Sequence, residues 1–497
     1  MVKQSAFRGG LATILAIVLL GAAADMSSAQ VPEPGSDPFY VPPADLASSK
    51  PGTILRSRAV TLAGVDNAKA AYQLLYRTTD AKGQPIATVT TLALPKAPAA
   101  GPRRLMSYHP ASDSLSMKCS PSYTLRSGNG QHGPGVGNVG ESDDVNSFLS
   151  LGWDVATPDY EGPNSAWAVG PLEGRTTLDG IRAVERFEQA ALEGTRTKVA
   201  IGGYSGGAIP SVWGASLAPT YAPELDIVAT ASGGETPDPI QNLPGLDGSP
   251  LFGTVLGVAV GVDRAYPELG LDALLNDKGK ALAERDRVDA DGCGGSVTNA
   301  PGGTVAQYSN YPNPEALLAV PRVQEVFAHL NLIKRPAPAA PSFILNSAQD
   351  ELTIPKPVNE LVAAWCAQGT KIQYETPPGE HLTGSALIGR YIVPYIQDRF
   401  AGKPPASNCP PGAPKPAVSA LRLSPRNLRV TYTLAAPASV RFTLAHKSGG
   451  KVSAITRSGH AGTNRFTLDR KLRAGNYVLT ATPAGGTRAR TTFNVAR

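Results

Sequence analysis

Residues 198–213 read Lys198-Val199-Ala200-Ile201-Gly202-Gly203-Tyr204-Ser205-Gly206-Gly207-Ala208-Ile209-Pro210-Ser211-Val212-Trp213. A short run of β-formers precedes the Gly-x-Ser-x-Gly pattern, and a helical pattern follows it. Strand, Gly-x-Ser-x-Gly and helix in this order are the layout of a nucleophile elbow. The sharp turn strains the backbone, and the glycines leave room where side chains would clash. A glycine-rich structural turn is the alternative. The pattern occurs once in the chain, and its context favours Ser205 as a catalytic nucleophile.

A hydrolase serine needs a base, and in α/β-hydrolases the chain order is Ser, acid, His. Two of the six histidines precede Ser205, one lies in an amphipathic helical stretch, and two belong to a separate C-terminal segment. These five are His109, His132, His329, His446 and His460. The remaining one, His381, lies in a turn-rich loop after a strand-like stretch at residues 371–375. Loops at strand ends commonly carry catalytic groups, so His381 is the candidate base.

The acid of such a triad should lie between Ser205 and His381, just after a strand. Residues 342–346 have the pattern of a buried strand, and Asp350 and Glu351 follow it closely. The acid would fix the tautomer of the histidine and stabilise its charged form. We choose Asp350 and keep Glu351 in reserve, because a pattern does not separate adjacent acids. The alternative role for Asp350 is to cap a helix near residues 357–361.

The segments that carry these candidates resemble the secretory lipases of the lipase A type. The likeness covers roughly residues 37 to 410. It includes Gly-Tyr-Ser-Gly-Gly, the acidic run from Asp350 to Pro355, and Glu380-His381-Leu382-Thr383. Supporting segments are residues 37–40, 119–123, 158–162 and 178–183. The resemblance implies an α/β-hydrolase with a helical lid that cleaves carboxylic esters.

The resemblance also implies an oxyanion hole and a disulfide pattern. In the family, the oxyanion hole uses the backbone N–H that follows the nucleophile and that of an upstream aspartate. These positions correspond to Gly206 and Asp113 here, although residues 109–112 depart from the family pattern. Four cysteines in a secreted chain suggest two disulfides with three possible pairings. The resemblance favours Cys119–Cys293 and Cys366–Cys409.

The composition is that of an exported enzyme. Lys3 and Arg8 precede an apolar run over residues 11–24, and small residues follow at 27–29. This pattern predicts a signal peptide over residues 1–29, too short and too early to be a membrane span. No Cys or His cluster has metal-ligand spacing, and no phosphate-binding glycine motif occurs. The predicted chemistry therefore needs no metal and no cofactor.

Strand and helix patterns predict an α/β-hydrolase domain over residues 30–403 with a helical lid. Strand-like segments recur up to residues 227–231 and return at residue 342. Strand-like segments do not recur between about residues 234 and 334. We predict that this region is the lid. An apolar, glycine-spaced stretch at residues 251–260 begins it. This stretch either faces acyl chains or packs on the core, and the sequence leaves both open.

A Pro-rich linker over residues 404–415 separates this domain from a last segment, residues 416–497. Short alternating strands with turn residues between them predict a small all-β sandwich, similar to immunoglobulin-like modules of secreted bacterial proteins. We call this segment the basic module. It has fourteen Lys or Arg and one acid, Asp469, which gives +13 and leaves −7 for residues 1–415. Attraction to anionic cell-wall polymers or membrane surfaces is one interpretation, and Arg on ordinary solvent faces is the other.

Three classes of function follow from these observations. A secreted lipase or carboxylesterase, acting on lipid esters such as triacylglycerols, accounts for the triad order, the lid and the family segments. Such an enzyme would be secreted and could be retained at the cell surface. A serine peptidase or amidase of the same fold and a non-catalytic surface-binding protein are the alternatives. Nucleic acid is excluded as a partner, because the basic module lacks interleaved aromatic residues.

Overall fold

The computed structural model describes residues 31–128, 141–288, 302–410, 417–435, 437–448, 450–468, 472–484 and 486–495. The predicted signal peptide lies outside these ranges, as do His132 and Cys293. Within the described ranges, no helix combines the length and the apolar character that a bilayer span requires.

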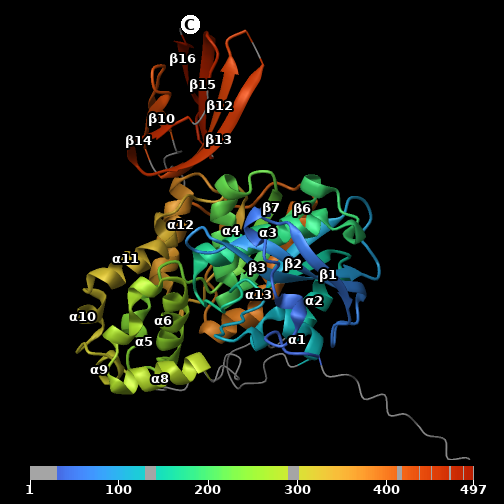
Figure 1. Ribbon diagram of the computed structural model, residues 1–497, viewed down its shortest axis with the longest axis vertical. Coiled ribbons are helices and arrows are strands. Elements are labelled where there is room, and N and C mark those ends of the chain that lie inside the picture. The colour runs from blue at the N-terminus through green and yellow to red at the C-terminus, as the bar shows by residue number, and fades with distance from the viewer. Residues whose placement is uncertain are drawn as a thin grey trace, which may run out of the picture. The chain divides into compact units, whose positions relative to one another are not determined.

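A mixed sheet of nine strands forms the centre of the predicted hydrolase domain, in the order β1-β2-β3-β5-β4-β6-β7-β8-β9. Figure 1 shows this sheet among its helices. Strands β1 to β3 are antiparallel, β3 pairs antiparallel with β5, and the strands from β5 to β9 are parallel. The strands are β1 (Ile54–Val60), β2 (Ala68–Thr79), β3 (Pro85–Pro95), β4 (Arg104–His109), β5 (Asp154–Pro158), β6 (Lys198–Tyr204), β7 (Asp226–Gly233), β8 (Ser342–Leu345) and β9 (Ile372–Glu375). Central parallel strands require helical crossovers, and the predicted α/β class is confirmed.

Helices cover both faces of this sheet and bury its apolar side chains. Leu178 and Ile181 of α3 pack in the same core as Ala218 of α4. Phe148 of α2 and Ile396 of α13 share a second core on the other face. The helices of these layers are α2 (Glu141–Ser150), α3 (Gly170–Arg186), α4 (Ala208–Tyr221), α12 (Pro355–Ala367) and α13 (His381–Phe400). Two covered faces explain why the parallel strands are continuous apolar runs.

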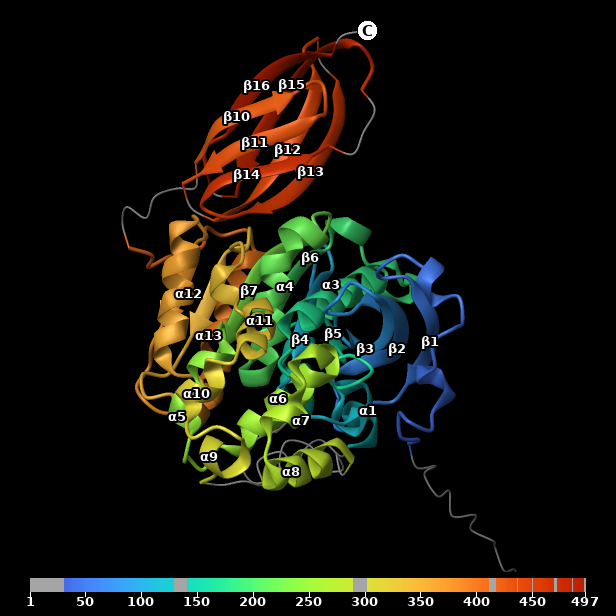
Figure 2. The same cartoon turned by 60° about the vertical axis from the view of Figure 1, so that its left-hand side comes forward.

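Between β7 and β8 the described residues form a group of helices, as predicted from the absence of strand-like segments in this region. We call residues 234–334 the insertion. Its helices are α5 (Leu243–Leu246), α6 (Gly253–Ala265), α7 (Leu271–Leu274), α8 (Asp277–Val288), α9 (Val305–Tyr308), α10 (Pro314–Leu318) and α11 (Pro321–His329). They gather on one side of the hydrolase domain (Figure 2). The expected apolar helix is α6, which begins at Gly253 and ends at Ala265.

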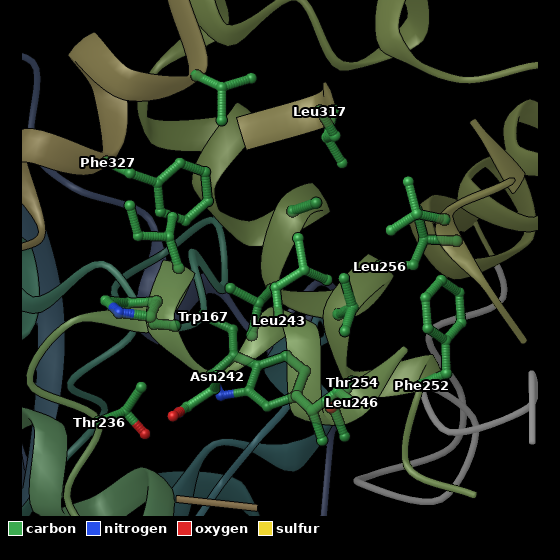
Figure 3. Close-up of a pocket in the computed structure, with 18 of the residues that line it drawn as sticks. Trp167, Thr236, Asn242, Leu243, Leu246, Phe252, Thr254, Leu256, Leu317 and Phe327 are labelled. Carbon is green, nitrogen blue, oxygen red and sulfur yellow. The ribbon is translucent and has the colours of Figure 1, made fainter. Parts of the chain in front are cut away.

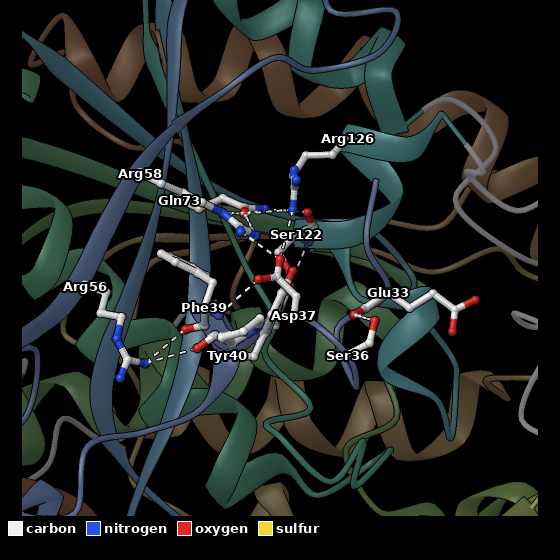
Figure 4. Close-up of polar contacts among 12 residues, drawn as sticks. Glu33, Ser36, Asp37, Phe39, Tyr40, Arg56, Arg58, Gln73, Ser122 and Arg126 are labelled. Atoms are coloured by element: carbon white, nitrogen blue, oxygen red, sulfur yellow. Dashed lines mark hydrogen bonds and ion pairs between the residues drawn. The ribbon is translucent and has the colours of Figure 1, made fainter. Parts of the chain in front are cut away.

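Polar contacts tie the N-terminal Asp-Pro-Phe-Tyr segment to the sheet and to α1 (Pro121–Ser127), as Figure 4 shows. One Asp37 oxygen accepts a 2.7 Å hydrogen bond from Arg58 of β1, and Arg126 of α1 lies 3.7 Å from the same oxygen. The hydroxyl groups of Tyr40 and Ser122 are 2.8 Å apart. The start of the described chain is therefore fixed by an ion pair of two arginines with one buried carboxylate.

One of the two predicted disulfides is present. Cys366 of α12 is bonded to Cys409, which is 43 residues further along the chain. Cys119 is buried, but its predicted partner Cys293 lies outside the described residues, so that pairing stays a prediction.

The basic module consists of two antiparallel sheets around a core of its own. One sheet has the strand order β10-β11-β14 and the other the order β13-β12-β15-β16. Inward side chains of both sheets, such as Tyr432 and Phe442, form one buried cluster. The strands are β10 (Val418–Ser424), β11 (Arg429–Leu434), β12 (Ala438–His446), β13 (Lys451–Gly459), β14 (Gly462–Thr467), β15 (Gly475–Pro483) and β16 (Ala489–Val495). The predicted all-β sandwich is confirmed.

Candidate active site

The Gly-x-Ser-x-Gly stretch forms a sharp turn between a strand and a helix. β6 ends at Tyr204, Ser205 follows at once, and α4 begins at Ala208. Ser205 has a φ of 55°, in the left-handed region that non-glycine residues rarely adopt. Such strain is typical of functional residues on tight turns, and it holds the hydroxyl at the end of the parallel sheet.

The glycines of this turn allow close contacts with neighbouring segments. A Cβ on Gly203 or on Gly207 would collide with the backbone of His109 at the end of β4. A Cβ on Gly206 would collide with the carboxyl group of Asp113. Steric exclusion, more than turn conformation, therefore explains these glycines.

His381 lies between the serine and an acid. Its Nε2 is 2.8 Å from Ser205 Oγ. Its Nδ1 is 2.8 Å and 3.0 Å from the two carboxylate oxygens of Asp350. A carboxylate only accepts hydrogen bonds, so Nδ1 carries the proton and Nε2 is free to accept one from Ser205. His381 and Asp350 are buried, whereas Ser205 is half-buried. This is the geometry of a Ser–His–Asp triad, in which the histidine can activate the serine.

The two adjacent acids have different contacts. Asp350 contacts the His381 ring, and it also accepts hydrogen bonds from the backbone N–H groups of Leu352 and Thr353. The alternative role of Asp350 as a helix cap is wrong, because α12 is preceded by Ile354 and has no side-chain cap. Glu351 is exposed and accepts a 3.0 Å hydrogen bond from the backbone N–H of His381. Glu351 thus orients the backbone of the histidine, and Asp350 orients its ring.

The position of His381 differs slightly from the expected loop. The loop after β9 ends at Glu380, and His381 is the first residue of α13. Its ring is anchored at a helix terminus, where the backbone is more rigid than in a loop. The first backbone N–H groups of a helix lack partners within it, which is why Glu351 can accept from His381.

Asp113, which the resemblance places in the oxyanion hole, has a left-handed backbone conformation and a backbone N–H without a partner among the described residues. Its φ is 42°. It lines the same pocket as Ser205 and Gly206. One of its carboxylate oxygens accepts a 3.0 Å hydrogen bond from Nε1 of Trp167. Burial raises the pKa of Asp113 to about 6, although the electrostatic interaction with His381 and the hydrogen bond from Trp167 lower it. The sequence gives no signal for this contact with Trp167.

An apolar pocket is lined by Ser205 and by residues of the insertion. Figure 3 shows part of its lining. It encloses about 1430 Å³ of space, including the part open to solvent. Its lining includes Leu243, Leu246, Phe252, Leu256, Leu274, Leu317 and Phe327 of the insertion and Trp167 of the hydrolase domain. In Figure 3 the labelled leucines and phenylalanines point into this space. Such a pocket suits a long hydrocarbon chain.

The apolar helix α6 takes both roles that the sequence leaves open. Val255, Leu256 and Ala259 line the pocket. Val260 is buried and packs in a core instead.

The other described histidines are far from this arrangement or have structural contacts. His109 is buried and hydrogen-bonds the hydroxyls of Ser107 and Ser211, and burial lowers its pKa to about 3. It is therefore a neutral core histidine. His329 ends α11 and stacks on Tyr266. His446 and His460 lie in the basic module.

Comparisons with known proteins identify the family of the chain. The model of the secretory lipase family matches residues 141–408. A Mycobacterium tuberculosis protein named "Probable inactive lipase" is 34% identical over 75% of this chain and 83% of its own length. A Malassezia furfur protein named "Secreted triacylglycerol lipase" is 32% identical over 77% of this chain and 83% of its own.

A solved structure extends the similarity to three dimensions. Candida antarctica lipase A in its closed state is 32% identical to this chain and superposes with a TM-score of 0.70. The match covers 78% of this chain and 91% of that one. The family model spans more than half of the chain, and several relatives share about a third of its residues over most of their length. The chain therefore belongs to the secretory lipase family.

Proposed function

We propose that this protein is a secreted carboxylic ester hydrolase that acts on lipid esters, triacylglycerols among them. The observation that carries the proposal is the pair of 2.8 Å contacts that link Ser205, His381 and Asp350. The named activity of the Malassezia relative supports the lipid substrate. Family membership without the intact triad would support only the fold.

In the proposed reaction, Ser205 Oγ attacks the ester carbonyl carbon and gives its proton to His381 Nε2. Asp350 stabilises the imidazolium that results. Backbone N–H groups of Asp113 and Gly206 donate to the oxyanion of the tetrahedral intermediate. His381 then protonates the leaving alcohol, and an acyl-enzyme on Ser205 remains. Water attacks this ester with His381 again as base, which releases the carboxylic acid and restores the serine.

The pocket of the insertion supports a lipid acyl chain as the group that is transferred. Its walls are almost entirely aliphatic and aromatic, and it opens beside Ser205 and Asp113. A peptide substrate would need partners for its amide groups, and this lining offers few. We therefore prefer ester over amide hydrolysis and assign the insertion the role of a lid over the acyl site.

The relative described as inactive makes a non-catalytic role the second candidate. The complete triad in this chain favours activity. The deciding experiment measures hydrolysis of p-nitrophenyl esters of increasing acyl length, of triolein and of a peptide amide. We expect turnover of the esters that is absent from Ser205→Ala. Absence of turnover in the unaltered chain on every ester would overturn the proposal, and preference for the amide would favour the peptidase.

We further propose that the basic module attaches the secreted enzyme to anionic surfaces. Its charge of +13, against −7 for the rest of the chain, supports this role. A chain that ends at Pro414 retains Cys366 and Cys409 and should hydrolyse soluble esters normally. It should also lose retention on anionic surfaces. If the truncated chain lost soluble-ester turnover, catalysis would depend on the basic module, and the proposal that the module serves only in attachment would be wrong.

A further inference from the structure

The three-stranded sheet of the basic module has one face without large apolar side chains. Along β11, Val430, Tyr432 and Leu434 point inward and are buried. The side chains between them point outward, as do their neighbours on β10 and β14. We call this outward surface the arginine face; Figure 2 labels its three strands. It consists of Ser419, Arg422, Ser424, Arg429, Thr431, Thr433, Thr463, Arg465 and Thr467.

The register of the strands places three arginines close together. Arg422 and Arg465 both pair with Thr431, one from each side. Adjacent strands are about 4.8 Å apart, so these two positions are about 10 Å apart. Arg429 lies two residues before Thr431 on the central strand, about 7 Å along it. The three positions form a triangle whose sides are comparable to the Debye length at physiological salt, about 8 Å.

No acid in the described part of the module offsets these charges. The module contains a single acid, Asp469, which lies outside the described residues. None of the three arginines of the face takes part in an ion pair within the described ranges. Like charges at this spacing repel one another, and an anion bound over the face would relieve that repulsion. Guanidinium groups favour oxyanions because they donate two parallel hydrogen bonds.

The rest of the face indicates which kind of anion fits. Six hydroxyl side chains surround the arginines and can hydrogen-bond a polar backbone. The exposed large apolar side chains of the described chain are Val41 and Leu382, both outside the module. A surface that inserts into a bilayer would carry apolar side chains, and a surface that stacks nucleic-acid bases would carry aromatic ones. The arginine face has neither, which favours a hydrophilic polymer.

We propose that the arginine face binds a linear, hydrophilic polyanion with repeated oxyanion groups, such as a phosphate-bearing polymer. The inference rests on the proposed surface attachment of the module and assigns it to one sheet face. The three arginines would each contact a different group along the polymer, and the Ser and Thr hydroxyls would contact the chain between them. A single phosphate would meet only part of this array and bind much more weakly.

The test compares two triple variants of the full chain with equal charge. One is Arg422→Gln, Arg429→Gln, Arg465→Gln. The matched control is Arg473→Gln, Arg488→Gln, Arg490→Gln, three exposed arginines of the same module outside the face. Binding to long-chain polyphosphate is measured over a series of salt concentrations. We expect the face variant to lose at least about tenfold in affinity, with a salt slope lower by about one for each arginine. The control should change much less.

Three results would overturn the assignment. Equal losses in both variants would show that net charge alone matters. Tighter binding to phosphatidylglycerol vesicles than to polyphosphate would indicate a membrane surface. Competition by monophosphate as strong as by polyphosphate, at equal phosphate concentration, would indicate a small-anion site. Soluble-ester turnover and thermal unfolding of the same preparations verify folding. If the unaltered chain bound no anionic surface at all, the proposed role of the module would fail as a whole, independently of its hydrolase activity.

Discussion

The phenol hydroxyl of Tyr204 donates a 2.7 Å hydrogen bond to the backbone carbonyl oxygen of His381. The ring centroids of these two residues are 5.2 Å apart. Tyr204 directly precedes Ser205 in the turn, and His381 begins α13. The bond therefore ties the turn that holds the proposed nucleophile to the helix that holds the proposed base, although the two are far apart in sequence.

Tyr204→Phe should lower kcat several-fold and leave KM nearly unchanged. The variant loses one hydrogen bond, about 1 kcal/mol, and Tyr204 does not line the pocket. Steady-state kinetics on a soluble ester measure both constants. Tyr221→Phe is the matched control, since its hydroxyl bonds Asp179 and Thr79 away from the site. It should lower stability without affecting kcat; a fall in kcat of equal size would mean that the Tyr204 effect is not local.

Replacement of the two neighbouring acids should separate their roles. Asp350→Asn should lower kcat by about 10⁴-fold, because the histidine loses the partner that fixes its tautomer. Glu351→Gln should retain most activity, since the amide oxygen can still accept from the His381 N–H. Ser205→Ala and His381→Ala should each cost about 10⁶-fold, and the losses should not add. The reverse order for the two acids would transfer the role of Asp350 to Glu351.

The carboxyl group of Asp113 should make the enzyme sensitive to rising pH. Its pKa is raised from 3.8 to about 6 by burial, so the folded state holds the proton more tightly than the unfolded state. Its contribution to stability is complete at pH below 3.8 and is lost as pH rises to about 6, by about 3 kcal/mol in total. Urea unfolding of the unaltered chain and of Asp113→Asn, from about pH 4 to about pH 7, isolates this difference.

The kcat/KM of the enzyme should also change over the pH range in which Asp113 ionises. An ionised Asp113 beside Gly206 places negative charge next to the proposed oxyanion, whereas the neutral form does not. The ratio of kcat/KM between the unaltered enzyme and Asp113→Asn should therefore fall as pH rises through about 6. A ratio independent of pH would place the carboxyl outside the electrostatic reach of the reaction.

Two residues of α6 provide a matched test of the pocket. Leu256 and Val260, one turn apart, are buried in the same core, but of the two only Leu256 also lines the pocket. Leu256→Phe should shift the acyl-length preference towards shorter esters, by about 1–3 kcal/mol per methylene excluded. Val260→Phe should instead overpack the core and cost about 1–3 kcal/mol of stability with the length profile unchanged. Thermal unfolding measures the cost of overpacking in both variants, and an ester panel measures the length profile; identical length profiles for the two variants would rule out the acyl pocket.

Local patterns account for the parts of the molecule that could be predicted. The strand, Gly-x-Ser-x-Gly and helix are contiguous, so the sequence alone predicts the turn at Ser205. Adjacent acids such as Asp350 and Glu351 cannot be separated by pattern, because only the folded backbone determines which carboxylate meets the His381 ring. The contact of Trp167 with Asp113 joins residues 54 apart, and no periodicity indicates it.

The Cys366–Cys409 disulfide has a mechanical consequence for an enzyme that is anchored through its C-terminal module. Tension applied to any residue beyond Cys409 is transmitted through the disulfide bond to Cys366 and α12. The stretch between them, which contains β9, His381 and the whole of α13, lies inside the covalent loop. Tension therefore bypasses this stretch. Shear on a tethered molecule would load the α12 side of the sheet, and the covalent path of that load would not include the proposed catalytic histidine.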